Sequence, residues 1–123
     1  MKCYNICLKT EMMNATITFS LQAAFLLPTL TAMYRKGLTT DQYQDVQTPQ
    51  AICVAPTREL ALQIYNDCRK FALHTDLRAV VLYGGTSVGY QLRQVESGAN
   101  FVIGTPGRLL DVINRGKVRH LVS

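Results

Sequence analysis

Short apolar runs alternate with amphipathic stretches between Ala51 and Asn114, and this alternation restricts the chain to few architectures. The apolar runs lack a two-residue period, which is typical of strands buried on both faces of a parallel sheet. Strands are predicted at Ala51–Ala55, Ala79–Tyr83 and Asn100–Ile103, and helices at Arg58–His74, Ser87–Glu96 and Pro106–Asn114. Strand and helix in strict alternation predict an α/β fold, with a parallel sheet and right-handed crossovers.

The region before this alternation is less regular. Apolar residues recur at helical spacing from Ala23 to Met33, and Arg35, Lys36 and Gly37 are a typical helix end. Pro28 falls inside this helix, where it removes a hydrogen bond and is expected to kink the axis. The polar stretch Leu38–Pro49 predicts an exposed loop. Residues 1–22 show no clear period, so no element is predicted there.

Three segments follow directly on the three predicted strands. They are Pro56-Thr57-Arg58, Gly84-Gly85 and Thr105-Pro106-Gly107-Arg108. The carboxyl ends of parallel strands are where open α/β sheets bind ligands. Thr57 and Thr105 are suited to cap the helices that follow, and the free amides of a first helical turn bind phosphate. Each segment is also explained by ordinary capping or by a turn, and only their coincidence at one edge favours a groove that follows a nucleic-acid backbone.

These segments resemble three successive signature motifs of the DEAD-box RNA helicases, in the order found in their first RecA-like domain. The likeness covers Ala23 to Arg119, and the string Tyr83–Gln91 resembles the Vasa branch, which acts in germ cells. The resemblance implies that Pro56, Thr57, Arg58, Gly84, Gly85, Thr105, Pro106, Gly107 and Arg108 contact the backbone of single-stranded or duplex RNA. It also implies a cytoplasmic location, with germ-cell granules and other RNA-granule proteins as associates.

The ATPase residues of that family have no counterpart in this sequence. A glycine-rich phosphate loop with a lysine and a threonine should precede Ala23, yet Leu21 and Gln22 occupy those two positions. Thr18 and Ser20 stand where glycines are needed. The sequence stops before the Asp-Glu-Ala-Asp motif. ATP and magnesium are therefore cofactors expected of the parent family, and no cofactor, catalytic residue or metal ligand is predicted in this chain.

Composition adds limits on the class of protein. The chain has 123 residues, enough for one domain, and a net charge of +5 that favours polyanionic partners. No segment is long or apolar enough to span a bilayer. Cys53 and Cys68 fall in core positions, which favours buried thiols in a reducing compartment. Cys3 and Cys7 provide half of a metal site, but no second pair completes it.

The resemblance thus implies an incomplete RecA-like sheet that lacks the strands carrying the phosphate loop and the acidic motif. The expected division is an unmatched segment at 1–22, a partial helicase domain at 23–119 and an unmatched tail at 120–123. Such a sheet should expose unpaired edges and be marginally stable or insoluble. The function predicted is that of a piece of an ATP-dependent RNA helicase, possessing RNA contacts without ATPase residues, as a truncated gene model would give. The alternatives are a short regulatory isoform that binds RNA and a nucleotide-binding α/β domain.

Overall fold

A computed structural model describes residues 4–7, 15–37 and 48–119 of the chain. Strands and helices alternate throughout this part. The strands are β1 (Tyr4–Cys7), β2 (Ala51–Val54), β3 (Ala79–Leu82) and β4 (Phe101–Gly104). The helices are α1 (Ala15–Lys36), α2 (Arg58–Phe71), α3 (Val88–Glu96) and α4 (Pro106–Asn114). The elements from β2 onward match the predicted ones within a few residues.

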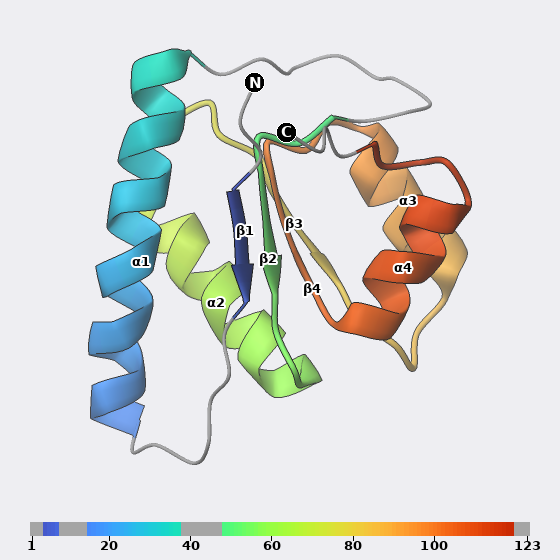
Figure 1. The fold of residues 1–123 in the computed structure, drawn as a ribbon, viewed down its shortest axis with the longest axis horizontal. Helices are drawn as coiled ribbons and strands as arrows, with labels where there is room; N and C mark the ends of the chain where they lie inside the picture. Colours follow the sequence, from blue (N-terminus) through green and yellow to red (C-terminus); the bar gives the residue numbers. More distant parts are fainter. Residues whose placement is uncertain (1–3, 8–14, 38–47, 120–123) are drawn as a thin grey trace.

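All strand pairs in the sheet are parallel, and the spatial order is β1-β2-β4-β3. Figure 1 shows the strands side by side, with β1 at one edge and β3 at the other. The chain passes from β2 to β3 before it returns to place β4 between them. Strand β4 is buried along its whole length, as a central strand must be, and the predicted parallel α/β class is confirmed.

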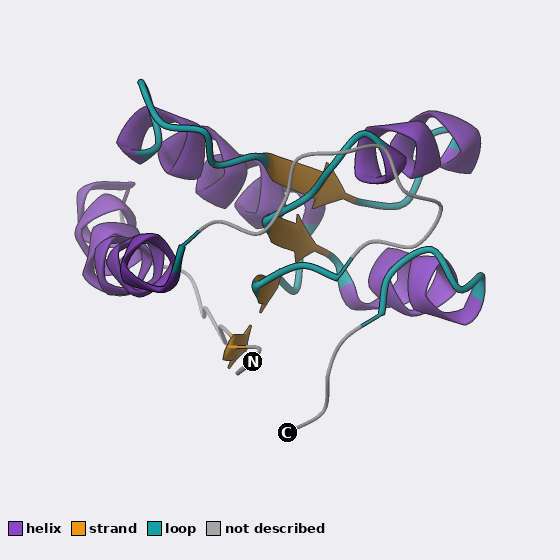
Figure 2. Cartoon of the chain, turned by 90° about the horizontal axis from the view of Figure 1, so that it is seen from above, coloured by secondary structure: helices purple, strands orange, loops and turns teal. Residues whose placement is uncertain are grey.

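Two layers of helices cover the two faces of the sheet (Figure 2). Helices α1 and α2 pack on one face around a core that includes Leu26, Ile64 and Phe101. Helices α3 and α4 pack on the other face, around Val95, Val102 and Val112. Successive residues of β4 thus point into different cores, which explains why the strand has no polar position.

The expectations for the N-terminal region are wrong in two respects. Helix α1 begins at Ala15 rather than at Ala23, and residues 4–7 form a strand. No glycine or proline lies between Ala15 and Leu27, so a helix that is anchored by packing at Leu26 and Leu30 can extend toward its N-terminus. The helix also continues past Pro28 to Lys36, and Gly37 ends it with a φ of 81°. Most of the predicted loop Leu38–Pro49 lies outside the described residues.

Strand β1 changes the expected edge of the sheet. Tyr4 to Cys7 pair in register with Ala51 to Val54, so the backbone of β2 has a partner on both sides. The prediction that the neighbours of the missing strands expose unpaired edges is therefore wrong for β2. The edges of the described sheet are β1 and β3.

Candidate nucleic-acid interface

The three predicted segments all start at the carboxyl ends of neighbouring strands. Val54, Gly104 and Leu82 are the last residues of β2, β4 and β3, and they are register partners across the sheet. Two backbone hydrogen bonds extend the pairing into the segments themselves: the amide of Ala55 donates to the carbonyl of Gly104 at 2.8 Å, and that of Thr105 donates to Leu82 at 2.9 Å. The segments therefore lie next to one another in the order 56–58, 105–108, 84–85.

Close packing at the end of β4 holds this edge together. Gly104 is buried, and a Cβ atom at this position would come within 2.8 Å of both the Leu109 side chain and the Leu82 carbonyl oxygen. Only glycine fits there without displacement of backbone. The short approach brings the start of α4 directly against the end of β3, so the second and third segments are neighbours.

The first segment begins helix α2. The amide of Leu60 donates to the hydroxyl of Thr57 at 3.2 Å, so the predicted cap is confirmed. Pro56, Thr57 and Arg58 are all exposed. The Arg58 guanidinium lies over the ring of Tyr83, 4.6 Å from its centroid, which is the geometry of a cation–π contact. This contact joins the first segment to the end of β3.

The second segment is a turn with an open backbone. Gly85 has a φ of 84°, a conformation that side-chain-bearing residues rarely adopt, and a Cβ there would be 3.8 Å from the Arg58 guanidinium. Gly84 has open space where a Cβ would stand. Both glycines are exposed, so their backbone is accessible to a ligand.

The third segment begins helix α4, with Thr105 at the N-cap and Pro106 in the first turn, as predicted. The Thr105 side chain makes no capping hydrogen bond, unlike that of Thr57. The Thr105 hydroxyl therefore does not occupy a first-turn amide of α4. Apart from the adjoining residues and the backbone of its own helix, no atom lies within 4 Å of the point that a Cβ of Gly107 would occupy, so this turn is open on its outer side.

Arg108 is held in place by a residue that the sequence analysis did not select. Its guanidinium donates to the Gln91 side-chain oxygen at 2.9 Å and to the Thr86 carbonyl at 3.1 Å. Gln91 is buried, and its amide donates to the Tyr83 carbonyl at 3.0 Å and to the Thr86 hydroxyl at 2.9 Å. A buried glutamine with this many partners is a fixed support. Its only signal in the sequence was a polar residue on an otherwise apolar helix face.

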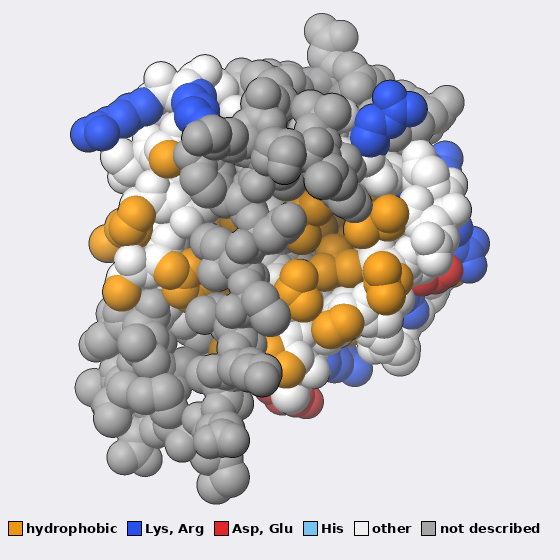
Figure 3. All heavy atoms as spheres, viewed as in Figure 1, with side chains coloured by type: hydrophobic (Ala, Val, Ile, Leu, Met, Phe, Trp, Pro, Cys, Tyr) orange, Lys and Arg blue, Asp and Glu red, His pale blue; other side chains and the backbone are white. Residues whose placement is uncertain are grey.

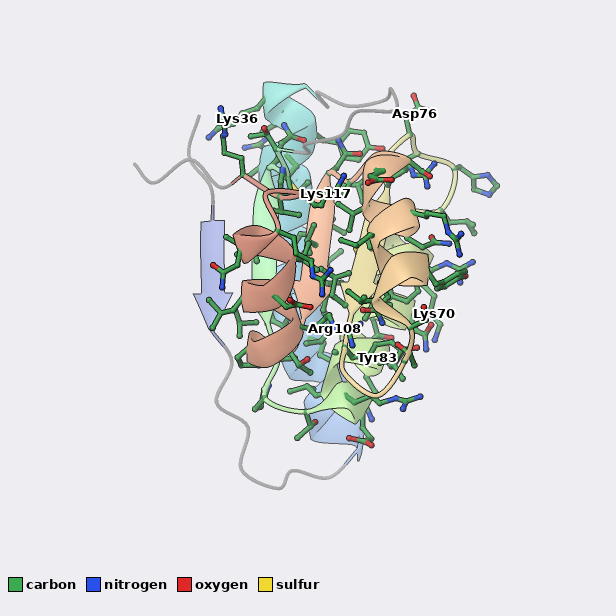
Figure 4. The ribbon with its side chains drawn as sticks, turned by 90° about the vertical axis from the view of Figure 1, so that its right-hand side faces the viewer. Lys36, Lys70, Asp76, Tyr83, Arg108 and Lys117 are labelled. Atoms are coloured by element: carbon green, nitrogen blue, oxygen red, sulfur yellow. The ribbon has the colours of Figure 1, made fainter. Side chains whose placement is uncertain are left out.

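Both arginines thus converge on the end of β3, from two different helices. In Figure 4, Arg108 and Tyr83 lie at one end of the sheet, whereas Lys36, Asp76 and Lys117 lie at the other. The acidic residues near the segments have separate explanations. Asp111 forms an ion pair with Arg115 at 3.0 Å, and Glu59 is exposed in the first turn of α2.

The structure does not fit a nucleotide-phosphate loop before Ala23. Residues 15–22 are the first turns of α1, and a continuous helix uses the backbone amides that a phosphate loop leaves free. Within the described ranges, no group of three His, Cys, Asp or Glu residues is placed to hold a metal ion. None of the helices described has both the length and the apolar character that a membrane crossing needs.

The fold and the site together define a class of protein. It is a parallel α/β domain with basic side chains and open glycines at the carboxyl ends of its strands. The family model for "DEAD/DEAH box helicase" matches residues 23–123. The chain belongs to the DEAD/DEAH box helicase family.

Similar proteins support this assignment. The chain is 52% identical over 96 residues to the probable ATP-dependent RNA helicase DDX4 of Bos taurus, and 51% identical over 96 residues to the ATP-dependent RNA helicase DDX4 of Mus musculus. These matches cover 78% of this chain, but only 13% and 14% of the two relatives. The predicted Vasa-like resemblance is confirmed at this level. The chain corresponds to a small part of the length of these helicases.

Solved structures show the same fold. The RNA helicase Prp28 from Chaetomium thermophilum, bound to ADP, matches with a TM-score of 0.64 and 34% identity, over 90% of this chain and 25% of that one. A hypothetical ATP-dependent RNA helicase from Sulfolobus tokodaii matches with a TM-score of 0.61 and 26% identity, over 91% of this chain and 28% of that one. The predicted RecA-like class is therefore confirmed.

Proposed function

We propose that the carboxyl edge of the sheet binds the sugar-phosphate backbone of RNA, as one part of an ATP-dependent RNA helicase. The observation that carries this proposal is the convergence of Arg58 and Arg108 on the end of β3, beside the open turns at Gly84 and Gly107. Backbone phosphates recur along a strand, so they are matched by several separate donors rather than by one deep pocket.

The support around each arginine explains how such a surface would bind. Gln91 and Thr86 hold the Arg108 guanidinium before any ligand arrives, and the Tyr83 ring does the same for Arg58. Because these side chains are already ordered, RNA binding does not have to pay the entropy of ordering them. More of the free energy of the contacts therefore appears as binding affinity. Phosphate contacts carry no sequence information, and the binding at this edge should therefore depend strongly on salt and weakly on base sequence.

A second part of the proposal is that this chain does not hydrolyse ATP. Helix α1 occupies the stretch in which a phosphate loop would be needed, and Leu21 supplies no charge there. The expected result of a steady-state phosphate-release assay, with magnesium, ATP and RNA present, is no turnover. Turnover that requires magnesium would contradict this part alone and leave the RNA surface as proposed.

The same features favour a non-catalytic RNA-binding module as the second candidate function. Such a module would occupy RNA or helicase partners and regulate a full-length helicase. We also propose a cytoplasmic location, with RNA-granule proteins of germ cells as partners, because the sequence resembles the Vasa branch. Antibody staining of germ cells and of somatic cells for the segment Tyr83–Arg93 would test that placement, and a signal confined to nuclei would contradict it.

Binding of single-stranded RNA to charge-matched variants tests the surface. Arg58→Ala and Arg108→Ala should each raise the Kd about tenfold or more, because a hydrogen bond to a charged group contributes about 1.5–3 kcal/mol. Each should also reduce the slope of log K against log salt by roughly 0.7 for every phosphate that the variant no longer neutralises. Arg78→Ala is the control, since this exposed arginine precedes β3 and therefore lies at the amino ends of the strands, away from the site. Equal losses in all three variants would reduce the proposal to an effect of net charge.

A further inference from the structure

A groove of about 310 Å³ opens at the free edge of β3, between α2 and α3. Its lining includes three tyrosines, Tyr65, Tyr83 and Tyr90, together with the polar side chains of Thr86, Gln91 and Gln94. Apolar positions of β3 and α2 complete it, and none of the lining residues is charged. A volume of this size is at the low end of the roughly 300–1,000 Å³ that small-molecule sites occupy.

The chemistry of this lining suits a flat, uncharged, hydrogen-bonding ring. Aromatic side chains provide faces for stacking, and glutamine amides donate to and accept from the edges of nucleobases. No basic residue is among the lining residues, and the guanidinium groups of Arg58 and Arg69 lie over the rings of Tyr83 and Tyr65. Tyr90 is 58% exposed, which is unusual for a large aromatic side chain, and its ring is therefore accessible to a stacking partner.

The groove is continuous with the proposed path of the RNA backbone. Tyr83 both lines the groove and carries the Arg58 guanidinium over its ring. Gln91 and Thr86 likewise line the groove and hold Arg108. A nucleotide whose phosphate lies at these arginines thus has its base within reach of the tyrosines.

We propose that the groove receives one unpaired base of the bound RNA strand, stacked on Tyr90, with the Gln94 amide at the edge of the base. The proposal rests on the proposed function, since the arginines must first hold the backbone. It adds a site for a base to a surface that otherwise contacts only sugar and phosphate. An extended peptide added to the edge of β3 is the other occupant that such a groove admits. The residues shared with the arginine network favour the base.

The test compares two probes of equal length and charge, a single-stranded RNA and an abasic ribose-phosphate oligomer. Tyr90→Ala in the full 123-residue chain should weaken binding of the RNA by roughly 5- to 150-fold, the range expected for loss of one stacked base, and leave binding of the abasic oligomer unchanged. Tyr90→Phe keeps the ring and should restore RNA binding. Tyr34→Ala removes an exposed tyrosine from α1 and should change neither probe.

Ultraviolet cross-linking of the wild-type chain to RNA, followed by mass spectrometry, should place a base on the peptide that contains Tyr90. The proposal is overturned if Tyr90→Ala weakens both probes equally, weakens neither, or fails to be rescued by Tyr90→Phe. Loss of a protein partner in Tyr90→Ala, with RNA binding intact, would overturn it in favour of a peptide groove. If RNA binding persists and depends on Arg108, only the base site has failed. If wild type binds neither probe, the proposed function has failed as well.

Discussion

Gly104 illustrates how one missing side chain sets the geometry of the site. The space for its Cβ is already filled by Leu109 and by the backbone of Leu82, so Gly104→Ala must displace one of them. We expect this substitution to lower the free energy of unfolding by about 1–3 kcal/mol, as overpacking in a core does. Urea denaturation followed by circular dichroism measures the loss.

Gly107→Ala is the matched control for that change. Gly107 has open space around it and lies in the first turn of α4, so an alanine there should leave stability unchanged or raise it slightly. The same variant should weaken RNA binding, because a methyl group would stand between the backbone and the phosphate. If Gly107→Ala lost as much stability as Gly104→Ala, the close packing around Gly104 would not be the cause of the loss.

Cys68 makes the stability of the core sensitive to alkaline pH. Burial, with a smaller contribution from Cys53, raises the pKa of the Cys68 thiol from 9.0 to about 12. Below pH 9 the thiol is protonated in both the folded and the unfolded chain. Between pH 9 and about 12 only the unfolded chain loses the proton, so stability should fall as the pH rises, by up to about 1.4 kcal/mol per pH unit.

Comparison with Cys68→Ala separates this thiol from other groups that titrate in the same range. The free energy of unfolding is measured by urea denaturation for both proteins at about pH 8 and about pH 10.5. The advantage of the wild type over the variant should shrink at the higher pH. An advantage that stays constant across the range would mean that the thiol ionises equally well in the folded chain.

At the scale of elements, the end of β3 depends on a single buried side chain of α3. Gln91 bonds both backbone groups of Tyr83 and also holds Arg108. Gln91→Leu keeps the size and leaves these groups without a partner, so we expect a loss of about 1–3 kcal/mol in unfolding free energy. Gln94→Leu on the same helix is exposed and should cost little. Thermal unfolding of the two variants checks the difference, and similar melting temperatures would argue against the role given to Gln91.

The elements from β2 onward could be predicted from the sequence because each has a strong local signal. Apolar runs define the strands. Thr57 and Pro106 mark helix starts through contacts or geometry within the same helix, which do not depend on any distant element. The start of α1 and strand β1 have weak local signals and depend on neighbours for their formation. The positions of the site segments followed from sheet topology. The bonds of Gln91 to Arg108 join helices that only the packed fold brings together, so no pattern of spacing could reveal them.

At the scale of the whole molecule, apolar surface that remains exposed should make copies of the chain associate with one another. Hydrophobic side chains gather on the face shown in Figure 3. On α4, the Leu110 side chain is 59% exposed. Strands β1 and β3 form the edges of the described sheet. Exposed apolar patches and open edges promote aggregation, so light scattering should detect an average mass that rises with concentration.

Leu110→Lys should reduce this association because it removes apolar surface from α4. Asn114→Lys on the same helix adds the same charge at an exposed polar position and should have a smaller effect. A wild-type chain that stays monomeric at all concentrations and melts in one sharp, cooperative transition would contradict the expectation. Equal improvement by both variants would assign the effect to charge rather than to apolar surface.

The strand order β1-β2-β4-β3 has a consequence for how the molecule is completed during synthesis. Strands β2 and β3 have no direct pairing, and each bonds to β4, which the ribosome delivers last of the three. A nascent chain that ends before Phe101 would therefore carry the first two site segments on strands that cannot yet join. Because strands pair only when both are present, the arrival of residues 101–104 closes the sheet and joins the two halves of the surface in one event.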